Sequence, residues 1–152
     1  MPHARLLLCC AYGAIAFLAL IGTWSQNLFY FRPQDGWLLG FALATGRFWP
    51  ETLATPASVS ITVDLGLFFL AASVFMVVES RRLDIRFPWL YVILGLLIAI
   101  SVTFPLFLIA RERRLEARGH DSAERRLARG DTAGLVVFGG AIAIFSLWTL
   151  GR

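Results

Sequence analysis

The sequence predicts an all-α fold, a four-helix transmembrane bundle with a short interfacial helix in the first loop. Hydrophobic residues make up 58% of the chain and charged residues only 16%, whereas about a quarter of the residues in a soluble domain are charged. Four apolar stretches are each long enough for a helix to cross a hydrocarbon core roughly 30 Å thick. They lie at residues 6–24, 59–78, 87–110 and 133–150.

The domain organisation follows from the length. Because 152 residues are too few for four spans and a separate soluble domain, we expect a single membrane domain over residues 1–152. The loop at residues 28–56 carries large apolar residues near helical spacing between Gly36 and Trp49. This segment is too short to cross, so it is predicted to lie in the headgroup plane. The alternative is a lid over a lipid-filled cavity.

The second and third spans have clear sequence signals. Thr55 and Pro56 are typical of the cap and first position of a helix. Pro105 lies inside the third span, where its ring removes the hydrogen bond to the carbonyl of Ser101 and is expected to kink the helix.

Asp64 is the only acidic or basic side chain well inside any of the four stretches. An unpaired carboxylate in lipid costs several kcal/mol, so Asp64 is expected to face the helix bundle. Two kinds of role are open for Asp64. The functional role is that of a proton site, a ligand anchor or an enzyme acid, and the structural role is that of a polar clasp between helices. Its candidate partners in an intramembrane polar site are Gln26, Asn27, Ser101 and Thr103.

A second group of charged residues lies where the second and third spans end. At such boundaries arginine meets lipid phosphate and neighbouring acids pair with it. The sequence therefore predicts an interfacial charge cluster of Glu79, Arg81, Arg82, Arg111 and Glu112.

Other chemistry has little support in the sequence. Cys9 and Cys10 are adjacent, and the only histidines are His3 and His120, so no metal site and no cofactor is expected. The net charge of +4 on a membrane protein favours contact with anionic headgroups over nucleic acid.

The orientation in the membrane stays open on the sequence alone. Four spans would place both termini on one side, with fewer arginines than the other side, so the positive-inside rule places the termini outside. Arg5 precedes the first span, however, and no charge follows that span until Arg32. This second signal favours the reverse orientation.

Several segments together resemble a known family. Asp64 is followed after fourteen residues by Glu79-Ser80-Arg81-Arg82, and Trp89 and the stretch Pro105–Glu112 come later. This pattern, over about residues 5 to 115, resembles a family of small bacterial membrane proteins catalogued only as a domain of unknown function. The resemblance implies a polytopic membrane protein and no activity, and typical members end soon after the arginine–glutamate pair. The matching positions are Asp64, Glu79, Arg81, Arg82, Pro105 and Arg111.

The predicted function is that of a non-catalytic accessory or scaffold subunit in the bacterial inner (cytoplasmic) membrane. This role is favoured because no catalytic constellation is evident. The expected partners are the lipid bilayer and either other membrane proteins or further copies of the chain. Two alternatives remain: a small transporter or permeation subunit that uses Asp64, and a membrane enzyme that acts on a lipid or isoprenoid substrate.

Overall fold

The computed structural model describes residues 2–119 and 129–151, and within these ranges the chain is helical, with no strand. The predicted all-α class is therefore confirmed for this part of the chain. The elements in order are α1 (Pro2–Asn27), the 3-10 turns η1 (Leu28–Tyr30) and η2 (Pro33–Asp35), α2 (Trp37–Thr52), α3 (Pro56–Leu83), α4 (Pro88–Leu97), α5 (Ile100–Ala117) and α6 (Arg129–Leu150).

Three helical segments are long and apolar enough to cross a membrane, and they identify a multi-pass membrane protein. They lie at Arg5–Tyr30, Pro56–Leu83 and Gly130–Leu150. The predicted number of four transmembrane helices is not confirmed, because the expected third span, residues 87–110, is divided between α4 and α5.

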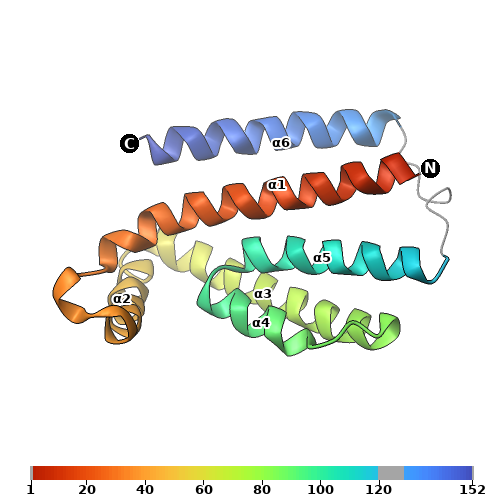
Figure 1. Cartoon of the computed structure of the whole chain (residues 1–152). Coiled ribbons are helices and arrows are strands. Elements are labelled where there is room, and N and C mark those ends of the chain that lie inside the picture. The colour runs from red at the N-terminus through yellow and green to blue at the C-terminus, as the bar shows by residue number, and fades with distance from the viewer. Residues whose placement is uncertain (1, 120–128, 152) are drawn as a thin grey trace.

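α4 and α5 form an antiparallel hairpin instead of one span (Figure 1). The rings of Tyr91 and Phe107 lie 5.5 Å apart between centroids. Nearer the turn, a Cβ on Gly95 would lie 2.8 Å from Thr103 Oγ1. In each pair the two residues lie equally far from Ala99 in the sequence, on either side of it, so the chain reverses direction at Ala99.

The backbone explains how the reversal is made. The Ile98 amide donates to the Leu94 carbonyl, and the Ala99 carbonyl then accepts from Val102 and Thr103. Ala99 itself is extended, with φ 178° and ψ 140°. Pro105 lies inside α5, which continues past it to Ala117. The change of direction expected at Pro105 is therefore found six residues earlier.

The hydrophobic core lies between α3, α4 and α5. Met76 of α3 and Phe107 of α5 are completely buried, and Tyr91 and Phe104 pack against this cluster. α1 packs along α5 and runs antiparallel to it (Figure 1).

α6 is the least covered helix. Every residue from Gly130 to Gly151 is exposed. Near its end, Leu150 Cδ1 lies 3.9 Å from the position that a Cβ on Gly22 would take. The N- and C-terminal ends of the chain lie at opposite ends of the bundle (Figure 1), whereas four full spans would have placed them together.

The start of α1 and the ends of α3 and α5 lie together at one end of the bundle (Figure 1), marked by Arg5, Glu79 and Glu112 and called here the network end. α4 has 10 residues, so the turn of the hairpin lies about 15 Å from the start of α4. α3 has 28 residues and a length of about 42 Å. The hairpin meets α3 at Phe68, whose ring packs on Phe104, and at Phe69, which lies beside Gly95, so its turn is level with the middle of α3.

The opposite end holds α2 and is called the α2 end. α2 includes the short helix predicted between Gly36 and Trp49 and continues to Thr52. Arg47 Nη1 ties it back to the preceding turns, because it donates to the Tyr30 carbonyl at 3.1 Å and to Asp35 Oδ2 at 2.7 Å.

Candidate functional site

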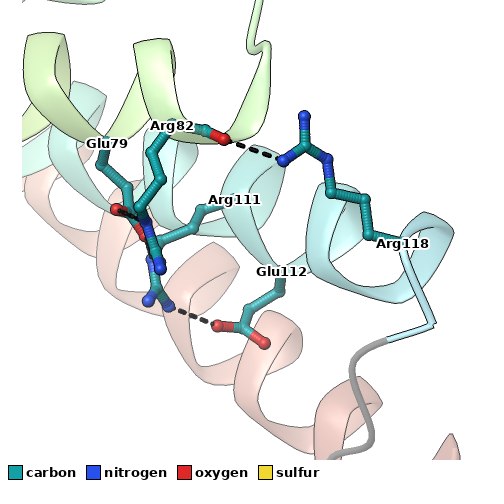
Figure 2. A network of polar contacts seen from close by, with 5 residues as sticks. All are labelled: Glu79, Arg82, Arg111, Glu112 and Arg118. Atoms are coloured by element: carbon teal, nitrogen blue, oxygen red, sulfur yellow. Dashed lines mark hydrogen bonds and ion pairs between the residues drawn. The ribbon is translucent and has the colours of Figure 1, made fainter.

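The most developed polar site is an ion-pair network centred on Glu79, near the end of α3. Its Oε1 accepts from Arg111 Nε at 2.7 Å and from Arg82 Nη2 at 2.6 Å, and its Oε2 accepts from Arg82 Nε at 2.7 Å. Figure 2 shows the guanidinium groups of both arginines beside this carboxylate. The arginine on α3 is thus one turn from Glu79, whereas the one on α5 joins two helices.

Arg111 extends the network along α5 to α1. Its Nη1 donates to Glu112 Oε1 at 2.9 Å (Figure 2). Glu112 Oε2 in turn lies 3.7 Å from Arg5 Nε, and Arg5 Nη1 lies 3.9 Å from Glu116 Oε1. One chain of ion pairs therefore connects α1, α3 and α5.

Burial and charge balance define what this network does. The side chains of Glu79 and Glu112 are 9% and 6% exposed, and those of Arg111 and Arg5 are 20% and 12% exposed. Buried charges of this kind are tolerated when they are paired and hydrogen-bonded. Hydrogen bonds from Arg82 and Arg111 to Glu79 and from Arg111 to Glu112, together with the 3.7 Å ion pair between Arg5 and Glu112, connect the three helices as a clasp.

A second ion pair, between Arg118 and Asp84, also lies at the network end. Arg118, just after α5, donates to the Arg82 carbonyl at 2.8 Å (Figure 2) and to the Asp84 carboxylate. Asp84 caps α3 in the left-handed conformation, with φ 53°. This contact holds the segment after α3 against the end of α5.

Of the five residues of the predicted interfacial charge cluster, the structure brings together four: Glu79, Arg82, Arg111 and Glu112. Arg81 is exposed and takes no part in these ion pairs. Sequence reasoning missed the part played by Arg5, because a residue at the start of the chain gives no local sign that it meets the end of α5.

Asp64 is exposed on α3, so the expectation that it faces the bundle is wrong. It lies one helical turn before Phe68, whose ring is 6.3 Å from that of Phe104 near the start of α5. Within the described ranges Asp64 makes no hydrogen bond and no ion pair. The physical reason is the reversal of the chain at Ala99. α4 and α5 turn back there before they reach the level of Asp64, so neither helix covers its side chain.

None of the other members of the predicted intramembrane polar site makes a hydrogen bond with Asp64 in the described part of the chain. Gln26 is exposed and Asn27 half-buried near the end of α1, and Ser101 is exposed in the first turn of α5. Thr103 is buried, and its hydroxyl donates to the Ala99 carbonyl at 3.4 Å. The hydroxyl of Thr103 therefore stabilises the hairpin turn.

Metal chemistry has no geometric basis in the part of the chain that the structure describes. There, no group of three or more His, Cys, Asp or Glu side chains is placed to hold a metal ion. Cys9 is half-buried and Cys10 exposed, and both are free thiols.

The long apolar helices and the ion-pair clasp at one end define a multi-pass helical membrane protein. The model of a family described as "Protein of unknown function DUF2834" matches residues 11–113. The chain belongs to this family, which confirms the predicted membership of a family of unknown function. No curated protein and no solved structure matches the chain.

Proposed function

We propose that the protein is a non-catalytic accessory subunit of the bacterial inner membrane that binds a neighbouring membrane protein laterally through the Asp64 side of α3. The observation that carries this proposal is the position of Asp64, which is exposed and has no partner among the described residues. It lies eight residues into α3, about 12 Å from the start of the helix.

The energetic argument concerns the cost of this carboxylate. An acid near the centre of a membrane helix costs about 2.5–3.5 kcal/mol when it faces lipid. A neighbouring helix that donates a hydrogen bond or a positive charge to Asp64 offsets that cost. Association therefore gains stability at a place where α3 leaves a carboxylate uncovered.

A second candidate is a small transporter or permeation subunit, favoured by the hairpin. α4 ends at Leu97 and α5 begins at Ile100, about 15 Å from the start of α4 and thus near mid-membrane depth. Broken helices at this depth line ion and substrate sites in secondary transporters. A path that used Asp64 would need further copies of the chain to enclose it.

The first test measures what accompanies the protein in native lipid particles extracted without detergent. The expected result is a particle containing a second protein or a second copy, beyond the 16.9 kDa chain, and Asp64→Asn is expected to reduce that association at least severalfold. Asp131→Asn is the matched control, because Asp131 is an exposed acid in the first turn of α6. A particle with one chain and lipid alone would refute the proposal.

The second candidate is tested in liposomes. A permeation subunit is expected to give a pH-dependent proton or ion flux that Asp64→Asn abolishes and Asp131→Asn leaves intact. If the wild-type protein gives no flux above empty liposomes, the permeation proposal fails while the accessory proposal stands.

A further inference from the structure

We propose that the network end binds anionic phospholipid headgroups through four arginines: Arg81, Arg86, Arg113 and Arg114. This inference does not depend on Asp64 or on the proposed accessory role.

The pairing of charges at the network end separates two kinds of arginine. The four acids at the ends of α3 and α5 and just after α3 each have an arginine partner. Glu79 pairs with Arg82 and Arg111, and Asp84 pairs with Arg118. Glu112 and Glu116 pair with Arg5.

The four arginines of the proposed surface differ from these paired ones. All four are exposed, and none makes an ion pair or a side-chain hydrogen bond with any described residue. Arg81 lies in the last turn of α3, Arg86 in the link to α4, and Arg113 and Arg114 near the end of α5. Among the described residues, no acid forms an ion pair with these four exposed guanidinium groups.

Two aromatic residues place this charge at headgroup level. Phe87 and Trp89, where α4 begins, are 73% and 57% exposed. Exposed aromatic residues at the ends of membrane helices, tryptophan above all, mark the membrane–water interface. Arg86 directly precedes this pair in the chain, so its guanidinium is within reach of lipid phosphates.

The chemistry favours a phosphodiester with net negative charge over a neutral headgroup. Guanidinium groups form two parallel hydrogen bonds with phosphate oxygens, and exposed arginine near the bilayer is attracted to anionic lipid. Among the described residues, the α2 end offers no comparable surface. Its two described arginines are Arg32, which is exposed, and Arg47, which pairs with Asp35.

The test measures lipid preference with the protein reconstituted in phosphatidylcholine vesicles. Spin-labelled phosphatidylglycerol and phosphatidylcholine report the motionally restricted lipid at the protein surface. For the wild-type protein, the association constant of the anionic lipid relative to the neutral one is expected to be about twofold or higher and to fall toward one in high salt.

The variant changes all four arginines to glutamine: Arg81→Gln, Arg86→Gln, Arg113→Gln and Arg114→Gln. Its lipid preference is expected to fall to about one, whereas the control Arg32→Gln at the α2 end keeps the wild-type value. If the fourfold variant does not fold, the two double variants, 81/86 and 113/114, are each expected to lose part of the preference. A wild-type protein without preference, or variants that keep the full preference, would overturn the proposal.

Discussion

Gly95→Ala tests the α4–α5 hairpin, the feature that leaves Asp64 uncovered. A Cβ at this position would lie 2.8 Å from Thr103 Oγ1 and 3.0 Å from Phe69 Cε2. Thr103 is 2% exposed and has a short side chain, so it cannot move away without disturbing the turn. Overpacking of this kind costs about 1–3 kcal/mol.

The control is Gly66→Ala on α3, where no atom lies within 4 Å of the added Cβ. At such a position alanine is expected to stabilise the helix by about 0.5–1 kcal/mol. The two glycine-to-alanine changes are therefore predicted to have opposite signs. The measurement is the free energy of unfolding of each variant in lipid bicelles.

The same measurement distinguishes the hairpin from a continuous span. In one straight helix, Gly95 and Thr103 would be separated by eight residues, about 12 Å along the axis, and the added methyl group would not meet the threonine. If Gly95→Ala stabilises the protein as much as Gly66→Ala does, the hairpin is refuted.

Two further predictions concern the network end. Arg111→Gln is expected to cost about 2 kcal/mol of stability, because it leaves buried Glu79 with Arg82 alone. Arg82→Gln should cost less than about 1 kcal/mol and exposed Arg81→Gln almost nothing, so equal losses in unfolding measurements would contradict the network. For orientation, the positive-inside rule places the network end in the cytoplasm. A thiol introduced with Ala117→Cys, in a chain without its native cysteines, should resist an impermeant reagent added outside intact cells, and labelling there would reverse the assignment.

The orientation prediction illustrates what topology adds to a sequence. The sequence alone gave two opposed signals, because it counted residues 87–110 as a full span. With the hairpin returning α5 to the network end, nine described arginines lie there, against two at the α2 end. Arg5, before the first span, lies on the arginine-rich side, so both signals now agree.

Much of the architecture could be predicted from local signals. Thr55 caps α3 by accepting from the Ser58 amide, and Pro56 is the first residue of the helix, as expected. The apolar lengths identified membrane helices, since length and hydropathy are properties of consecutive residues. The short helix of the first loop was likewise visible in the spacing of its large side chains.

The reversal at Ala99 could not be predicted from its neighbourhood. Ile98, Ala99 and Ile100 include no glycine or proline, and Pro105 gave the stronger breaking signal. The turn depends on contacts between distant residues, in particular the close approach of Gly95 to Thr103. The missed turn led directly to the wrong placement of Asp64.

The proposed lateral contact is tested most directly by a photo-crosslinker placed at Leu67, an exposed position one turn after Asp64, and activated in living cells. The account predicts a discrete protein adduct, with a partner or a second copy, that Asp64→Asn weakens and that a crosslinker at exposed Leu18 of α1 does not give. Adducts with lipid alone at Leu67, unchanged by Asp64→Asn, would contradict it.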